Sequence, residues 1–289
     1  MNVEDETNED MDNQVFLPTD QDYKITVEKY PRVERVAELS FCLCIAAVSF
    51  ALEASDVSPR MRPIPFQLLD SSGEYIVNQV YNQEFNGETV SSLNLLLLAF
   101  FLPLLVQLGL SYFYGKNHVH KSLCVWLSGF GINGIVTDCI KLYAGYLRPI
   151  FYEFCEPDED YEECTSGQDK HMRLSFPSGH SSMSFCGLCI LSFYLEQRFG
   201  VSKLRNFIYD ETSGRLVAGY GGPVRFRRII SLLCYLPVAL ACFIAASRVA
   251  DDKHHPADVV GGAFIGASVA SLVHSIWYPS WPTIEHVVS

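Results

Sequence analysis

The feature of this sequence that most restricts its fold is a set of long apolar runs. The clearest reads LNLLLLAFFLPLLVQLGL and contains no charged residue. An α-helix of roughly 20 apolar residues crosses the roughly 30 Å hydrocarbon core of a bilayer. Because backbone polar groups in lipid must find partners within the segment, such runs predict helices rather than isolated strands. A water-soluble helical bundle is the alternative, but helices with so little amphipathicity are unusual in water.

Six segments show this pattern and predict an all-α membrane protein with six transmembrane helices. They cover about 36–54, 90–114, 120–145, 179–199, 229–248 and 257–277.

The charge of the chain, a formal net −12 in 289 residues, is unevenly distributed. The first residues, MNVEDETNEDMDNQ, are strongly acidic and carry little apolar content, which predicts a disordered cytoplasmic tail over 1–22. They show neither the basic region nor the apolar region of a cleavable signal peptide. The six-helix domain is expected over 23–277, with a short cytoplasmic tail over 278–289. No internal repeat and no basic patch for nucleic acid is apparent.

Basic residues near the expected helix ends predict the orientation of the chain. They gather in three regions that a six-helix topology places on one side of the membrane, and the positive-inside rule makes that side cytoplasmic. The residues are Lys24, Lys29, Arg32, Arg35, Lys116, Lys121, Arg198, Lys203, Arg205, Arg215, Arg225, Arg227 and Arg228. Both termini are then cytoplasmic. The 55–89, 149–177 and 249–256 loops face the exterior or a lumen, in the plasma membrane or an internal membrane such as the endoplasmic reticulum, Golgi or endosome.

Eight of the ten cysteines lie in expected spans, where a thiol packs as a small apolar group. Cys186 and Cys189 form a CxxC pair on an apolar helix, which favours packing over a redox or zinc function. Cys155 and Cys164 instead flank the acidic loop CEPDEDYEEC on the expected oxidising side. A disulfide between them is expected, with two free thiols as the alternative.

The first polar cluster lies at the end of the third span, in TDCIKLYAGYLRP. Lys141 and Arg148 are seven residues apart, about two helical turns, so both are expected to project from one helix face. Asp138 is placed to pair with Lys141. Pro149 marks the helix end. Snorkelling of two basic side chains to the interface is the alternative explanation.

The second cluster is FPSGHSS, at the start of the fourth span. Ser178 is a candidate N-cap, and Gly179 allows close approach of a ligand to the backbone. Amides at a helix N-terminus bind anions, phosphate above all. His180 follows in the first turn. Ordinary helix-start chemistry with a surface histidine is the alternative.

The third cluster, SRVADDKHHPAD, joins the fifth and sixth spans. Ser247 and Arg248 close one helix, and His254 and Asp258 are four residues apart across the junction. An aspartate there can hold one imidazole nitrogen and leave the other as a free lone pair. A metal site of His254, His255 and Asp258 is one alternative, weakened by the nearby cations. A merely charged turn is another.

All three clusters fall at helix ends that the expected topology places on one membrane face. Basic side chains and helix-start amides converging there suit a phosphate group. Two histidines, one held by a carboxylate, suit a nucleophile and a general acid. The catalytic site is therefore expected at the outer ends of helices three to six.

The same residues resemble the three-part signature of the type 2 phosphatidic acid phosphatase superfamily, and within it the integral-membrane lipid phosphate phosphatases. The matching motifs are Lys141-x6-Arg148-Pro149, Pro177-Ser178-Gly179-His180 and Ser247-Arg248-x5-His254-x3-Asp258. The resemblance covers about 36–277.

The resemblance implies a role for each matching residue. His254 is similar to the family's nucleophile, which forms a phosphohistidine, and Asp258 to the residue that orients it. His180 corresponds to the general acid and base. The phosphoryl oxygens would be held by Lys141, Arg148, Ser178, Gly179 and Arg248. No metal and no cofactor is implied, because the cations supply the positive charge that Mg²⁺ provides elsewhere.

The implied activity is Mg²⁺-independent hydrolysis of phosphatidate, lysophosphatidate, sphingoid phosphate or diacylglycerol pyrophosphate. A lipid phosphotransferase or a polyprenyl pyrophosphate phosphatase on the same scaffold is one alternative, and a non-catalytic lipid-binding membrane protein is another. The expected partners are the lipid substrate and the bilayer; association of several copies of the chain is compatible with the sequence. In the 55–89 loop, Arg60 and Arg62 either lie on lipid headgroups or pack as ordinary loop residues.

Overall fold

The computed structural model describes residues 32–68, 75–113, 115–159, 163–199, 207–210, 215–218 and 224–278. All of these belong to one unit, Tyr30–Trp281; a second unit, Met1–Lys29 with Pro282–Ser289, lies outside them. The acidic tail expected over 1–22 and almost all of the tail expected over 278–289 therefore fall outside the described residues. So does most of the basic loop between Phe199 and Val224.

Helices make up most of the described chain, in agreement with the predicted class. The long ones are α1 (Arg32–Glu53), α3 (Leu102–Tyr112), α4 (Lys116–Ala144), α7 (Gly179–Phe199), α8 (Val224–Cys234), α9 (Leu236–Ala250) and α10 (Pro256–Trp277). The short ones are α2 (Ser92–Leu96), α5 (Phe151–Cys155), α6 (Asp169–Met172), a 3-10 turn η1 (Gln79–Tyr81) and a π-helical turn η2 (Leu97–Phe101).

Two short antiparallel hairpins, which the apolar pattern did not predict, lie in the loops. β1 (Phe66–Leu68) pairs with β2 (Tyr75–Val77), with Phe66 opposite Val77. β3 (Phe207–Asp210) pairs with β4 (Arg215–Ala218). Because both hairpins lie in connecting loops, the chain remains helical in class, as predicted.

Five helical segments of the described chain are long and apolar enough to cross a bilayer. They are Arg32–Glu53, Ser92–Tyr112, His118–Ala144, Arg228–Ala250 and Pro256–Trp277. Helix α7, expected as a sixth span, has 21 residues but carries several serines along its length. Two of these serines contact neighbouring helices: Ser181 donates to the Val259 carbonyl at 2.7 Å, and Ser182 accepts a hydrogen bond from Thr137 at 3.1 Å.

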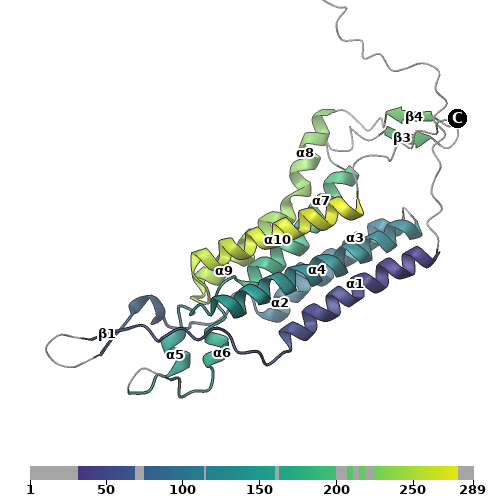
Figure 1. Cartoon of the computed structure of the whole chain (residues 1–289). Helices are drawn as coiled ribbons and strands as arrows, with labels where there is room; N and C mark the ends of the chain where they lie inside the picture. The colour runs from purple at the N-terminus through teal and green to yellow at the C-terminus, as the bar shows by residue number, and fades with distance from the viewer. Residues whose placement is uncertain are drawn as a thin grey trace, which may run out of the picture. The chain divides into compact units, whose positions relative to one another are not determined.

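The arrangement of the long helices places α7 against α10, α9 and α4, and α1 against α4 (Figure 1). The closeness of α7 and α10 depends on Gly266. A Cβ at this position would contact the Ser182 carbonyl oxygen and lie 2.8 Å from the Cys186 nitrogen. Cys186 and Cys189 of α7 are buried free thiols, as the packing interpretation predicted.

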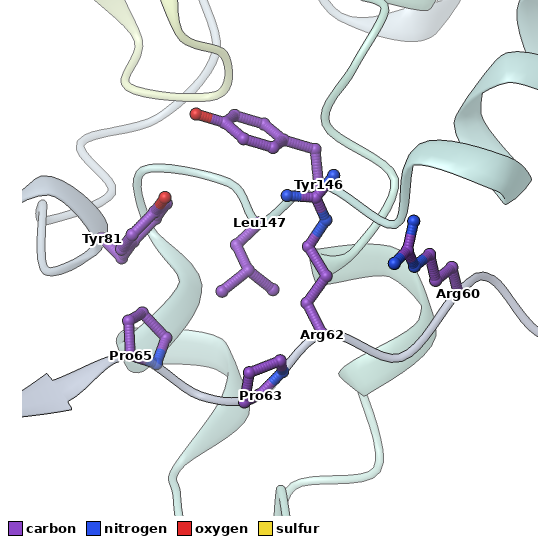
Figure 2. Close-up of a pocket in the computed structure, with 7 residues that line it drawn as sticks. All are labelled: Arg60, Arg62, Pro63, Pro65, Tyr81, Tyr146 and Leu147. Carbon is purple, nitrogen blue, oxygen red and sulfur yellow. The ribbon is translucent and has the colours of Figure 1, made fainter.

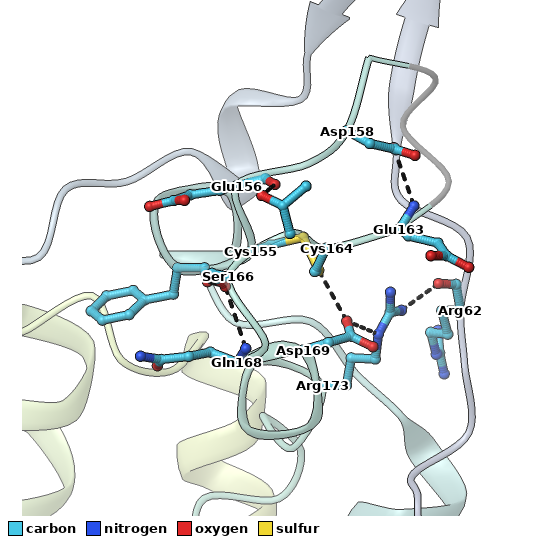
Figure 3. The surroundings of a disulfide bond; sticks show 12 residues. Arg62, Cys155, Glu156, Asp158, Glu163, Cys164, Ser166, Gln168, Asp169 and Arg173 are labelled. Carbon is cyan, nitrogen blue, oxygen red and sulfur yellow. Dashed lines mark hydrogen bonds and ion pairs between the residues drawn. A yellow bond between two sulfur atoms is a disulfide. The ribbon is translucent and has the colours of Figure 1, made fainter.

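An apolar cluster lies at one end of the long helices, near β1, α5 and α6 (Figure 1). Its buried residues are Ile64, Leu147, Ile150, Phe151, Tyr152, Cys155 and Met172. Cys155 and Cys164 form a disulfide across the acidic loop, with their Cα atoms 4.7 Å apart (Figure 3). This covalent link holds the acidic loop against α5.

Candidate active site

Lys141 lies in the last turn of α4 and pairs with Asp138 at 3.6 Å, as the i, i+3 spacing predicts. The helix stops at Gly145, which adopts a left-handed conformation with φ of 53° and donates its N–H to the Lys141 carbonyl at 3.0 Å. Glycine adopts this conformation without a side-chain penalty. The end of α4 is therefore set three residues before Arg148.

Arg148 consequently lies outside the helix. Its backbone N–H donates to the Met172 carbonyl at 3.0 Å, and its Nε donates to the His171 carbonyl at 3.2 Å. The prediction that Lys141 and Arg148 project from one face of the same helix is wrong, because the Gly145 cap intervenes. The segment before α7, rather than α4, positions Arg148.

The start of α7 brings the second predicted cluster to the same region. The buried Ser178 accepts a hydrogen bond from the Ser181 N–H at 3.4 Å through its Oγ, the contact expected of an N-cap. Its own N–H donates to the Asp258 carbonyl at 2.9 Å, which ties the start of α7 to α10. A Cβ on Gly179 would lie 2.9 Å from Lys141 Nζ. The Lys141 ammonium group therefore rests on the first residue of α7.

The start of α10 carries the carboxylate. Asp258 is fully buried, and its Oδ2 accepts hydrogen bonds from Ser175 Oγ at 2.6 Å and from the His255 N–H at 2.9 Å. The same oxygen lies 3.5 Å from His254 Nδ1. Because Nδ1 faces Asp258, the Nε2 atom is the ring nitrogen left for a substrate.

Arg248, in the last turn of α9, is 1% exposed. Its guanidinium lies 3.3 Å from Ser247 Oγ, and its carbonyl accepts the His254 N–H at 3.2 Å. The arginine and the histidine are thus linked through the backbone of the same turn.

Electrostatic coupling joins these residues into one group. Burial lowers the pKa of His254; Asp258 raises it, while the positive charges of Arg148 and Lys141 lower it. The charges that act on His180 come from Arg248, Glu88, Arg148 and Lys141. His180 Nε2 is buried and has no hydrogen-bond partner within the described part of the chain. The eight predicted residues therefore come from three separate segments and meet at one site.

Comparison with known proteins shows the family of this chain. The family model described as the PAP2 superfamily matches residues 122–282, more than half of the chain and a range that contains all eight residues. The chain belongs to the PAP2 superfamily.

Several relatives of this PAP2 chain are named lipid phosphate phosphatase or phospholipid phosphatase. Lipid phosphate phosphatase 1 of Arabidopsis thaliana is 32% identical over 209 residues, which cover 68% of this chain and 57% of that protein. Lipid phosphate phosphatase 2 of the same plant is 34% identical, over 58% of this chain and 56% of that protein. Phospholipid phosphatase 1 of Rattus norvegicus is 31% identical, over 55% and 54%. The chain thus spans only about half the length of these relatives, and no solved structure matches it significantly.

Two residues of the PAP2 site were missed by sequence reasoning. Asp251 Oδ2 pairs with Arg248 Nη2 at 2.5 Å. Thr89 holds the same carboxylate, through its N–H at 2.9 Å and its Oγ1 at 2.5 Å. The i, i+3 spacing of Arg248 and Asp251 could have predicted their ion pair. Nothing in the sequence predicted that Thr89 contacts Asp251.

Lys253 and Glu88 form a further ion pair, which links the turn before α10 to the segment before α2. Lys253 Nζ lies 3.2 Å from Glu88 Oε1 and 3.9 Å from the centre of the Phe85 ring. Burial lowers the pKa of Arg148, while the charges of Asp258 and Glu88 raise it, so Glu88 lies within electrostatic reach of Arg148. The segment 85–89 therefore contributes negative charge near the site.

The donor atoms of the metal alternative do not converge in this PAP2 chain. His254 Nδ1 faces Asp258, whereas His255 Nε2 lies 3.1 Å from the Leu147 carbonyl oxygen. The one metal-like grouping within the described ranges is Cys155, Cys164 and Asp169, and its two sulfurs are bonded to each other. The geometry around His254 instead favours an anion bound by cations and helix-start amides, with a neutral imidazole beside it.

Proposed function

We propose that this PAP2 chain is a lipid phosphate phosphatase that needs no divalent metal. The observation that carries the proposal is the meeting of His254, held by Asp258, with three basic side chains and the start of α7. Charge-assisted hydrogen bonds of this kind are the strongest that a protein offers to a phosphate. The names of the relatives support the reaction class.

In the proposed mechanism, Lys141, Arg148 and Arg248 bind the phosphoryl oxygens, with Ser178 and the Gly179 amide at the start of α7. Preorganised positive groups stabilise the charge that spreads over these oxygens in the transition state. Their contribution resembles that of Mg²⁺ in other phosphoryl-transfer sites.

The first chemical step forms a phosphohistidine. The lone pair of His254 Nε2 attacks phosphorus, the bond from phosphorus to the lipid oxygen breaks, and protonated His180 donates its proton to that oxygen. Asp258 accepts the Nδ1 proton in a hydrogen bond and stabilises the imidazolium that forms. The dephosphorylated lipid leaves.

The second step returns the site to its first state. Neutral His180 accepts a proton from water while the water oxygen attacks phosphorus, and the phosphorus–nitrogen bond breaks. Phosphate is released, and His254 Nε2 regains its lone pair. Proton transfer thus runs in opposite directions through His180 in the two steps.

For the membrane arrangement we propose six spans, the five apolar segments and α7. A 21-residue helix is roughly 31 Å long, enough to cross the hydrocarbon core. Within a bundle its serines face other helices instead of lipid. The site then lies at the outer ends of α4, α7, α9 and α10, facing the exterior or a lumen, with both termini cytoplasmic and the domain over 23–277.

The proposed substrates are phosphatidate, lysophosphatidate, sphingoid phosphate and diacylglycerol pyrophosphate, whose acyl chains remain in the outer leaflet. The test is release of phosphate from phosphatidate by the purified chain in detergent with EDTA present. We expect His254→Ala to lower turnover by about a thousandfold or more, because the nucleophile is lost.

His274→Ala is the matched control, since His274 is a half-buried histidine on α10 outside the site. It should keep turnover within a few fold of the unchanged chain. Full activity of His254→Ala, or loss of activity on adding EDTA, would contradict the proposal. Transfer to an added lipid alcohol, measured in the same reaction, separates a phosphotransferase from a hydrolase.

A further inference from the structure

A cavity of about 370 Å³ lies beside the candidate active site and uses none of its eight residues. It is formed by the loop after α1, by η1 and by the segment after α4 (Figure 2). Its lining residues are Arg60, Arg62, Pro63, Pro65, Tyr81, Tyr146 and Leu147. The lining thus carries two guanidinium groups and two phenols, and no carboxylate.

The cavity adjoins the catalytic residues through His255. The ring of His255 contacts Tyr146 and Tyr81, with ring centres 5.3 Å and 5.7 Å apart. His255 follows His254 directly, and Tyr146 precedes Arg148 by two residues. The cavity and the predicted catalytic residues are therefore neighbours along both of these segments.

The arginines of the cavity are held in place. Arg62 Nε donates to the Ala144 carbonyl at 2.7 Å, and its guanidinium lies over the Tyr146 ring at 5.3 Å. The Arg62 carbonyl accepts a hydrogen bond from the buried Arg173 (Figure 3). These contacts fix the guanidinium plane, a geometry suited to bidentate recognition of an oxyanion.

The backbone of Arg60 is fixed as well. Its N–H donates to the Leu142 carbonyl at 2.8 Å, and a Cβ on Gly145 would overlap the Arg60 carbonyl group. Its guanidinium has no hydrogen bond or ion pair within the residues that the structure describes. It is therefore a free cation on a fixed backbone, available to a ligand.

The phenols complete the donor set. Burial raises the pKa of the Tyr81 phenol and the neighbouring Tyr146 raises it further, while Arg62 lowers it. Part of this effect is a hydrogen bond between the two phenols, so the Tyr81 and Tyr146 hydroxyls lie next to each other. Pro63, Pro65 and Leu147 provide an apolar floor for the carbon atoms of a headgroup.

We propose that this cavity is a second phosphate subsite, which binds a phosphate group several bonds away from the one that is hydrolysed. The inference rests on the proposed function. Two sources offer this chemistry: a second phosphate within the substrate headgroup, or the phosphodiester of a neighbouring anionic lipid. Two guanidinium groups, with the phenol pair beside them, match the oxygens of such a group.

The experiment compares two lipids with identical acyl chains, phosphatidate and phosphatidylglycerol phosphate, with the full chain in phosphatidylcholine bicelles. If the substrate supplies the second phosphate, Arg60→Gln lowers kcat/KM for phosphatidylglycerol phosphate by about tenfold and leaves that for phosphatidate within twofold. If a neighbouring lipid supplies it, added phosphatidylglycerol changes phosphatidate turnover, and Arg60→Gln removes that change.

Two further variants separate a binding role from a structural one. Arg62→Lys keeps the charge but loses the planar fork, and should show the same selective loss at an unchanged melting temperature. Arg32→Gln removes an exposed arginine at the far end of α1, roughly 30 Å away, and should change neither readout.

The inference is overturned if Arg60→Gln and Arg62→Lys leave both readouts unchanged, or lower activity on both lipids equally. Absence of phosphate release from either lipid by the unchanged chain would instead count against the proposed function. The subsite is then tested by native mass spectrometry, in which Arg60→Gln should retain less phosphatidylglycerol than the unchanged chain. Equal retention would overturn it.

Discussion

At the scale of single residues, the Arg248–Asp251 pair shows how the site holds a buried cation. Arg248 is almost fully buried, and Asp251 in turn is held by Thr89. A buried charge that loses its partner is destabilised and loses its preferred direction. We therefore propose that Asp251 positions Arg248 at the proposed phosphate site.

We expect Asp251→Asn to lower kcat/KM for phosphatidate by roughly tenfold to a hundredfold, because Arg248 loses its ion pair. Inhibition by vanadate, which mimics the transferring phosphoryl group, should weaken more than substrate binding does. Thr89→Val, which removes only one hydrogen bond to Asp251, should have a smaller effect in the same direction. An Asp251→Asn protein with unchanged vanadate affinity would contradict the positioning role.

The titration of His254 gives a second prediction. Its pKa in the folded chain lies below the ordinary value of roughly 6.5 because the ring is buried. Above pH 6.5 the ring is neutral in both the folded and the unfolded chain and contributes no pH dependence. Below pH 6.5 the unfolded chain binds a proton that the folded chain does not, so folding stability falls as the pH falls.

At pH 5.5 this difference amounts to about 1 kcal/mol. The melting temperature of the purified chain should therefore fall by a few degrees more than that of His254→Gln between pH 7 and pH 5.5. Parallel curves for the two proteins would show that His254 does not titrate abnormally.

At the scale of elements, the contact between α7 and α10 sets the distance between His180, at the start of α7, and Asp258, at the start of α10. Gly266→Leu would push a side chain into the Ser182 carbonyl and the Cys186 backbone. We expect a loss of about 1–3 kcal/mol, seen as a melting temperature lower by several degrees in detergent. Gly109→Ala in α3 is the control, since a Cβ there meets nothing within 4 Å; its melting temperature should stay equal or rise.

The sequence predicted the long apolar helices well, but it did not predict how the chain continues after them. Apolar runs identify long helices because lipid demands an apolar exterior, and the site residues follow from motifs at helix ends. The predicted span over 120–145 ends where α4 ends, but the expectation that Arg148 lies on the same helix was wrong, because the left-handed Gly145 ends the helix first. The Thr89–Asp251 contact spans 162 residues and depends on the folded loop, so no local pattern reveals it.

At the scale of the whole molecule, the proposed topology places the disulfide-bonded loop outside and the turn before α4 inside. In a background with lipid-facing Cys44, Cys139 and Cys242 replaced by alanine, we expect Ser166→Cys to react with an impermeant maleimide applied to intact cells or sealed outside-out vesicles. Phe113→Cys, in the exposed turn after α3, should react only after permeabilisation. Equal labelling from outside would reject the six-span arrangement.

The hydrogen bond from the Ser178 N–H to the Asp258 carbonyl does not depend on any side chain. It joins the start of α7, where we propose that phosphate binds, to the first turn of α10 through main-chain atoms alone. Replacing side chains around it leaves that joint in place. Substitutions in the loops beside the proposed site can therefore alter headgroup preference without loosening the contact between α7 and α10.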